Sequence, residues 1–360
     1  MNPFRLSQRA ILALLLPVAL LLLPPASASA AGVRWTEGSF EAALAKAKAE
    51  GKPVLLDLYA TWCGPCHKLD AEVFPAEEVA NITDGMVAMR IDAESEAGIP
   101  LVERYHVVGY PTVLLLRADG TEIDRIFGFL PAPAFATALT DDLSGKGTLE
   151  ALRDQVKAAP DDLELLFDFG FRASVRGLAN EAEVALQTVI QRAKGSAAGL
   201  DRRALMVLAK YHYLRGSKQY AKAVETFVVI EREFAGSGEA SEARVQTVVA
   251  YLKAGNAPAA AAAAERAFAA EPDAGTANAI AWFYFREKRE FATGISIARR
   301  GLELAPKDAG LRDTLAELLA ANGEHKAAAT ESARAQADEP TDPYYAKQAT
   351  RFAAAAAAAP

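Results

Sequence analysis

Cysteine is scarce in this chain of 360 residues, which has two, Cys63 and Cys66, separated only by Gly64 and Pro65. Small secreted proteins that are held together by disulfides carry several pairs, so the sequence does not belong to that class. A disulfide between residues so close together removes little entropy from the unfolded chain, and about 330 residues bury ordinary cores without one. The pair is therefore expected to serve chemistry and not stability.

Long apolar runs are also lacking after the first residues. Residues 10–23 are almost wholly apolar, but this run of about 14 residues is shorter than the roughly 20 that span a membrane. Arg5 and Arg9 precede it and the small residues 26–30 follow, which is the three-part pattern of a secretory signal peptide. We expect residues 1–31 to be removed and the mature protein to be exported, periplasmic or secreted, without a membrane span. A membrane anchor is the alternative.

Basic clusters and metal-ligand spacings are missing as well. The net charge is −7, with 9 basic and 18 acidic side chains in residues 32–143 and 28 of each in residues 144–360. This distribution argues against nucleic-acid binding, and it would steer a basic substrate or partner toward the first part. His106, His212 and His325 are isolated from one another, so no metal site is expected.

The residues around the cysteine pair alternate between strand and helix patterns. The run 53–60 is almost unbroken and apolar, as in central strands that are covered on both faces. Strands are predicted over 53–60, 86–92, 112–117 and 122–127, with a hairpin turn at 118–121, and helices over 39–50, from 66 to about 80, over 99–105 and over 133–143.

Asp57 lies inside the first apolar run, six residues before Cys63. A buried carboxylate without a partner costs several kcal/mol unless its pKa rises and it stays protonated. A buried acid behind a thiol pair suits proton transfer. The alternative is an aspartate at a strand edge that faces water, but the apolar neighbours leave it no polar face.

Two further features accompany Asp57 and the segment 62–66. The segment 109–112, Gly-Tyr-Pro-Thr, precedes a strand, where proline is tolerated, and Gly128 follows the hairpin. Together these residues resemble the thioredoxin superfamily over roughly residues 35–143. The segments 52–59 and 73–74 are most similar to the thioredoxin-like domain of exported thiol:disulfide interchange reductases.

This resemblance implies an α/β thioredoxin-like domain over residues 32–143, a central mixed sheet flanked by helices, in which Pro111 is cis and lies against the active-site sulfurs. The family's usual lysine near the buried acid is missing, because the matching position is Ala88. Arg90, two residues on, is a candidate substitute.

Cys63 is expected at a helix N-terminus, where the dipole and free N–H groups favour a thiolate. It would attack a substrate disulfide, and Cys66, the more buried sulfur, would then release the reduced substrate while Asp57 takes its proton. No cofactor beyond the redox-active disulfide is expected. The residues expected to contact substrate are Trp62, Gly64, Pro65, Tyr110 and Pro111.

Residues 63–67 also satisfy C-x-x-C-H, the pattern of covalent haem c attachment. A haem site would make Asp57, Trp62 and the segment 109–112 coincidences, and it would need an apolar pocket in place of a sheet. His67 is more simply a residue of the first helical turn that tunes the local charge.

After the linker 144–150 the strand signals disappear and an alanine-rich helical pattern follows. Pro272, Pro306 and Pro340 are each 34 residues apart, which is the tetratricopeptide period. The segments 279–286 and 291–304 read as one helix pair, and residues 220–230 as the second helix of an earlier one. We expect an all-α tetratricopeptide-type array over residues 151–350, with about five helix pairs starting near Pro160. Residues 351–360 form a low-complexity tail, of which residues 353–359 are expected to fray.

Three functions fit these features. We expect an exported thiol-disulfide oxidoreductase, by resemblance a reductase of protein disulfides that borrows electrons from a membrane thiol donor. Its partners would be disulfide-containing exported proteins, and the repeats would bind a protein or peptide or serve as a spacer or dimerisation module. The alternatives are an interaction scaffold with a redox-inactive thioredoxin fold, and a disulfide oxidant or isomerase, since the Gly64-Pro65 dipeptide does not fix the reduction potential.

Overall fold

A mixed four-stranded sheet, in the order β2-β1-β3-β4, organises the first part of the computed structural model, which describes residues 32–196 and 198–358. Strand β1 pairs in parallel with β2 and antiparallel with β3, and β3 and β4 form an antiparallel hairpin. The strands are β1 Val54–Tyr59, β2 Val87–Asp92, β3 Thr112–Leu116 and β4 Glu122–Phe127, as predicted to within two residues. The expected signal peptide, residues 1–31, lies outside the described residues.

Helices cover both faces of this sheet, which confirms the α/β fold. Leu56 and Leu58 of β1 face a core shared with α1 and α4, while Leu55 faces a second core shared with α3 and α5. Because side chains alternate along a strand, an unbroken apolar run supplies both cores. The helices are α1 Phe40–Glu50, capped by Ser39 and ended by Gly51, α3 Glu77–Thr83, α4 Ile99–Arg104 and α5 Ala132–Leu143.

The helix predicted from Cys66 to about Ala80 is wrong in one respect, because it is not continuous. It begins as α2 Gly64–Lys68, widens into the π-helical turn η1 Leu69–Val73, and ends before α3. Pro75 lies at the break. Proline has no N–H with which to continue the helical hydrogen bonds.

Antiparallel helices make up the rest of the described chain, as the repeat pattern predicted. A first helix, α6, precedes five helix pairs, and α17 closes the array. Of the three prolines spaced by 34 residues, Pro272 and Pro306 lie between successive pairs, and Pro340 lies between the last pair and α17. The helices are α6 Leu149–Ala158, α7 Leu163–Val175, α8 Ala179–Arg192, α9 Leu200–Val207 with the π-helical η2 Leu208–Gly216, α10 Tyr220–Glu233, α11 Gly238–Lys253, α12 Ala257–Ala270, α13 Ala274–Arg286, α14 Phe291–Leu304, α15 Ala309–Ala321, α16 His325–Asp338 and α17 Pro343–Ala358.

Small residues set the close packing inside the array. Ala281 and Ala298 are fully buried, and a side chain at Gly301 would collide with Ala277 and Leu311. The expectation that residues 353–359 fray is wrong as far as the described chain reaches, because α17 continues to Ala358, and Phe352, directly before these residues, is buried in the array core. Alanine has the highest helix propensity, and this aromatic anchors the segment.

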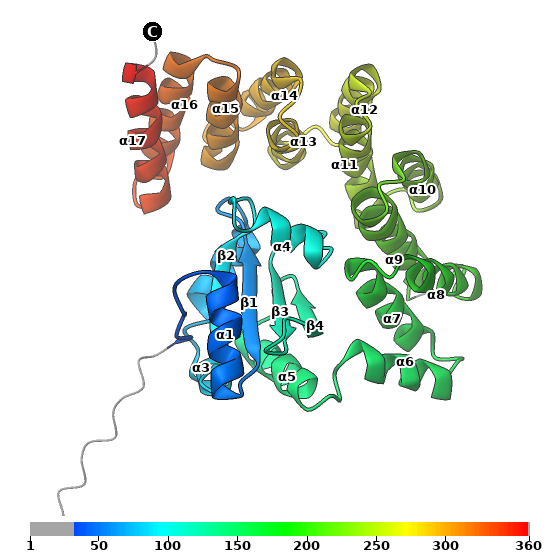
Figure 1. The fold of residues 1–360 in the computed structure, drawn as a ribbon. Coiled ribbons are helices and arrows are strands. Elements are labelled where there is room, and N and C mark those ends of the chain that lie inside the picture. Colours follow the sequence, from blue (N-terminus) through cyan, green and yellow to red (C-terminus); the bar gives the residue numbers. More distant parts are fainter. Residues whose placement is uncertain (1–31, 197, 359–360) are drawn as a thin grey trace, which may run out of the picture.

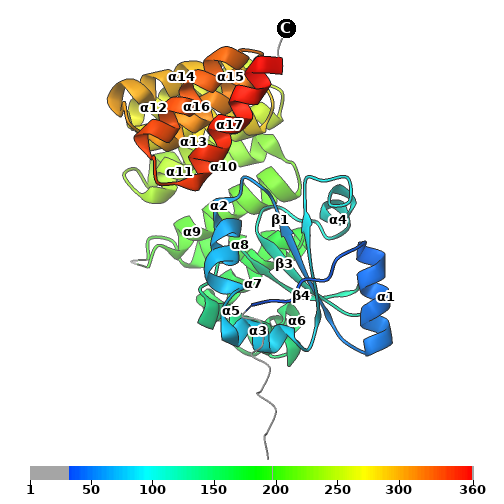
Figure 2. The same cartoon turned by 90° about the vertical axis from the view of Figure 1, so that its left-hand side faces the viewer.

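The array curves around the α/β domain. In Figure 1 the helices rise from α6 beside α5, pass α9, and arch over the domain to α17. The view turned by 90° in Figure 2 shows α11–α17 above the α2 end of the sheet. Among the helices of residues 32–196 and 198–358, none combines the length and apolarity that crossing a bilayer would need.

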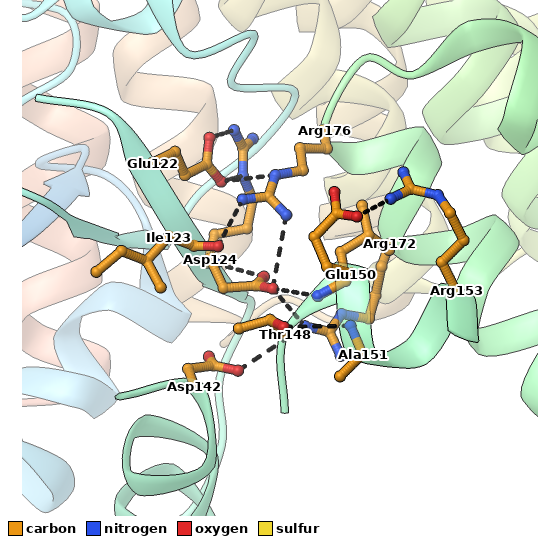
Figure 3. A network of polar contacts seen from close by, with 12 residues as sticks. Glu122, Ile123, Asp124, Asp142, Thr148, Glu150, Ala151, Arg153, Arg172 and Arg176 are labelled. Carbon is orange, nitrogen blue, oxygen red and sulfur yellow. Dashed lines mark hydrogen bonds and ion pairs between the residues drawn. The ribbon is translucent and has the colours of Figure 1, made fainter. Parts of the chain in front are cut away.

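A buried ionic network holds the start of the array against the sheet (Figure 3). Asp124 of β4, 1% exposed, pairs with Arg172 at 3.0 Å and with Arg176 at 3.5 Å, and it accepts the backbone N–H of Leu149 at the start of α6. Arg176 also donates to the backbone oxygen of Ile123. These contacts fix the helices to the sheet edge near the linker.

An aromatic cluster continues the same interface. Phe127 at the end of β4 packs against Phe171 of α7 and Tyr211 of η2, with ring centroids 6.0 and 5.3 Å apart. Arg215 of η2 lies 3.5 Å from the backbone oxygen of Val108, in the loop that leads to Pro111. The array therefore touches the segment next to the candidate site.

Candidate functional site

The cysteine pair stands where β1 gives way to helix α2. Cys63 is the N-cap of α2, and its sulfur accepts the backbone N–H of Cys66 at 3.2 Å, as the sequence predicted for a helix N-terminus. The two sulfurs form a disulfide with Cα atoms 5.2 Å apart. The free N–H groups of a helix start stabilise a thiolate at Cys63 when this bond is reduced.

Both cysteines are buried to the same degree, with Cys63 2% and Cys66 3% exposed. The expectation that Cys66 is the more buried sulfur is therefore wrong for this conformation. Tyr59, Trp62 and Tyr110 pack against the pair and cover it. These three rings therefore leave little of either cysteine exposed in the oxidised form.

Asp57 is buried within β1, at 1% exposed, as predicted. Burial raises the pKa of this carboxyl to about 7, against the attraction of Arg90 and with a smaller contribution from the charge of Asp70. One carboxyl oxygen, Oδ1, has no hydrogen-bond partner in the described chain. A buried acid that titrates near neutral pH suits the transfer of a proton.

Arg90 is the cation nearest to Asp57. It lies opposite Asp57 in the β1–β2 register, with 3.6 Å from its Nη2 to the carboxyl Oδ2. The guanidinium also pairs with Asp70 at 2.9 Å and lies over the ring of Tyr59. Ala88 pairs with Leu55, two residues before Asp57, and faces the same side of the sheet without a charge. Arg90 thus lies beside the buried acid, where it was a candidate to replace the lysine that the family usually has.

The other predicted site residues gather around the disulfide. The Tyr110–Pro111 peptide bond is cis, as the resemblance implied, and Tyr110 stacks edge-on against Trp62 with centroids 5.9 Å apart. Gly64 and Pro65 are exposed in the first turn of α2. His67 lies in the same turn, where its Nε2 is 2.9 Å from the backbone oxygen of Thr61.

Helix α13 of the array adds residues that the sequence analysis missed. Trp282 lies 6.2 Å from Trp62 between ring centroids, and the Arg286 guanidinium lies over the Trp62 ring at 3.2 Å. Arg286 also pairs with Glu94 at 3.1 Å. The residue pattern of α13 could have indicated this contact. The helix buries Ile280, Ala281 and Tyr284 on one face, and it carries further aromatic residues on the other.

A cleft of about 1430 Å³ separates the disulfide region from the inner face of the array. Trp62, His67 and Tyr110 line it on one side, and Trp282 and Phe285 on the other. A polypeptide that reaches the disulfide through this cleft contacts both parts of the chain.

Comparison with known proteins agrees with this geometry. Residues 40–141 match the family described as "Thioredoxin-like domain". The thiol:disulfide interchange protein DsbD of Cronobacter sakazakii is 46% identical over 103 residues, which are 28% of this chain and 18% of that protein. The chain therefore corresponds to less than a fifth of this curated relative.

Two solved structures resemble separate parts of the chain. A structure of a putative disulphide-isomerase from Bacteroides thetaiotaomicron is 32% identical and covers 32% of this chain and 97% of that one, with a TM-score of 0.30. A tetratricopeptide repeat protein from Parabacteroides merdae is 13% identical. The match covers 53% of this chain and 72% of that one, with a TM-score of 0.37.

Proposed function

We propose, on the premise that residues 40–141 belong to the thioredoxin-like domain family, that the protein is an exported reductase of protein disulfides whose helical array binds the substrate. The observation that carries this proposal is the Cys63–Cys66 disulfide at a helix start, with a buried Asp57 in the strand before it. An oxidoreductase of this fold needs these two elements, a stabilised thiolate and a nearby proton acceptor.

The reaction begins with the reduced pair. The Cys63 thiolate attacks one sulfur of the substrate disulfide, so that a mixed disulfide forms and the other substrate sulfur leaves as a thiolate. Cys66, deprotonated by Asp57, then attacks Cys63 and releases the second substrate thiol. Two electrons have moved from the protein to the substrate, and the Cys63–Cys66 disulfide is formed.

The disulfide is the only redox group that this cycle uses, and no further cofactor is part of the proposal. A thiol donor must return two electrons to Cys63–Cys66 after each turnover. We propose a membrane protein with a dithiol in this role, in keeping with the export expected from residues 1–31 and with the similarity to interchange proteins.

Trp62, Tyr110 and Pro111 form the rim on which an extended substrate segment lies, and Gly64 and Pro65 contact it from the exposed turn of α2. Trp62 and Tyr110 lie on the cleft that the array closes from the other side. The array then serves as a second wall that holds the segment at the disulfide.

The Cys63→Ser variant tests the proposal. Reduction of disulfide-containing proteins by the reduced mature protein should be lost in this variant and kept in a control such as Ser144→Ala in the linker. Rates that do not change in Cys63→Ser would contradict an oxidoreductase function. They would favour an interaction scaffold, a second candidate that the burial of both cysteines supports.

A further inference from the structure

The charges on the two walls of the cleft differ. The array contributes six basic side chains and one acidic side chain, whereas the redox domain contributes two glutamates. The array residues are Arg215, Lys218, Arg286, Lys288, Lys347, Arg351 and Glu317, and the glutamates are Glu94 and Glu103.

Only part of this positive charge is neutralised. Arg286 pairs with Glu94, and Arg351 pairs with Glu317. Four basic residues of the array wall form no ion pair with a described residue. Among the three glutamates of the cleft, Glu103 alone has no basic partner among the described residues. The four are Arg215, Lys218, Lys288 and Lys347. The inner face of the array therefore attracts an acidic ligand.

The turns inside the five helix pairs give an independent indication. In each of them the residue just after the cap of the first helix has a positive φ. Three turns use glycine here, Gly177, Gly255 and Gly323, which is the residue that this conformation favours. The other two use Lys218 and Lys288, with φ of 56° and 52°.

Both lysines line the cleft and are exposed. Glycine would satisfy the turn at a lower conformational cost, as it does in the other three turns of the array. The turn itself therefore does not explain a lysine at these two positions. A side chain that contacts a ligand in the cleft does explain it.

We propose that the cleft binds an extended acidic segment of a disulfide-containing protein, and that Lys218 and Lys288 recognise its carboxylates. The segment lies in the cleft beside the contact of Trp62 with Trp282, so that the disulfide to be exchanged reaches Cys63. This inference rests on the proposed oxidoreductase function and adds a substrate class to it. The acidic redox domain, by contrast, predicted a basic substrate from sequence alone.

Single-turnover exchange tests the inference on the full mature protein. The protein is reduced with dithiothreitol, freed of reductant, and mixed with one of two synthetic peptides that carry the same internal disulfide, flanked by glutamates or by lysines. Each turnover oxidises Cys63–Cys66 and yields one reduced peptide. At low salt the glutamate peptide should react faster, and salt should reduce the difference.

The variant Lys218→Gly/Lys288→Gly should lower the second-order rate constant for the glutamate peptide about tenfold. It should not change the rate with bis(2-hydroxyethyl) disulfide, which is small and uncharged, and its thermal stability should not fall, because glycine suits both turns. Adding Gly323→Lys restores one positive charge in a turn outside the cleft and should not restore the rate.

Each outcome bears on one hypothesis. If the unaltered protein reacts with both peptides at equal rates, or if the double variant keeps its preference for the glutamate peptide, the acidic-segment inference is wrong while the oxidoreductase function stands. If the unaltered protein reduces neither peptide nor bis(2-hydroxyethyl) disulfide, the proposed function itself is wrong.

Discussion

The indole of Trp62, next to the disulfide, lies 6.2 Å from the indole of Trp282 in the array, measured between ring centroids. One residue comes from the loop before Cys63 and the other from a helix more than 200 positions later. This contact joins the redox site to the repeats, so the stability of each part is expected to depend on its contact with the other.

A double-mutant cycle measures that dependence. Aromatic pairs contribute about 0.5–1.5 kcal/mol beyond their buried area, so Trp62→Ala and Trp282→Ala should show a coupling free energy of about 1 kcal/mol in urea unfolding. Trp35, the third tryptophan, packs against Phe74 in the redox domain and reports its unfolding by fluorescence. Val184→Ala, at an exposed position of α8, serves as the control partner. Additive effects of the two tryptophan substitutions would rule out direct coupling.

The two cysteines should behave differently when each is replaced. Cys66→Ser keeps the attacking sulfur but removes the sulfur that resolves the mixed disulfide, so covalent complexes with substrate should accumulate. Cys63→Ser should form none. Non-reducing electrophoresis with mass spectrometry detects such complexes. Complexes that form through Cys66 alone would reverse the assigned roles.

Replacing Asp57 by Asn should stabilise the protein at alkaline pH and slow exchange. The pKa of Asp57 is raised to about 7, so the folded protein keeps a proton that the unfolded chain releases above about pH 4. Its contribution to the free energy of unfolding therefore falls as the pH rises from about 4 to about 7. The Asn variant does not have this loss. Its free energy of unfolding should exceed that of the unaltered protein by at most roughly 4 kcal/mol at pH 8, and the difference should shrink toward pH 4.

Denaturant unfolding of the oxidised protein at several pH values measures this gain, with Glu78→Gln at an exposed site of α3 as the control. A gain in stability that does not depend on pH would show that the carboxyl is not the titrating group. The exchange rate of the unaltered protein should rise through an apparent pKa near 7, and this step should disappear in the Asn variant.

The ionic network at the sheet edge should be essential for joining the two parts. Replacing Asp124 by Asn removes the buried carboxylate that Arg172 and Arg176 share, although Asp142 and Glu122 still lie near them. Breaking a buried pair costs about 3–5 kcal/mol, which is the upper limit expected here. Differential scanning calorimetry should show the loss, together with faster proteolysis in the linker. Asp119→Asn in the exposed β3–β4 turn is the matched control, and an equal stability of the two variants would contradict the role of the network.

The sequence was sufficient to predict the parts of the fold that depend on local patterns. The apolar runs around Asp57 placed the buried strands, and the prolines spaced by 34 residues placed the turns between helix pairs. Local patterns do not specify contacts between distant segments, so the pairing of Trp62 with Trp282 and the ionic partners of Asp124 were not predicted. The equal burial of Cys63 and Cys66 was missed because it depends on how Tyr59, Trp62 and Tyr110 pack against the disulfide.

The reduction potential of the Cys63–Cys66 pair tests the proposed function most directly. The mature protein is equilibrated in thiol buffers of graded potential, and the free thiols are trapped and counted. A reversible two-electron transition near −270 mV, about the thioredoxin value, is the predicted result for a reductase that receives electrons from a donor. A value near −120 mV would make the protein an oxidant, and no reversible transition would contradict a redox role for the pair.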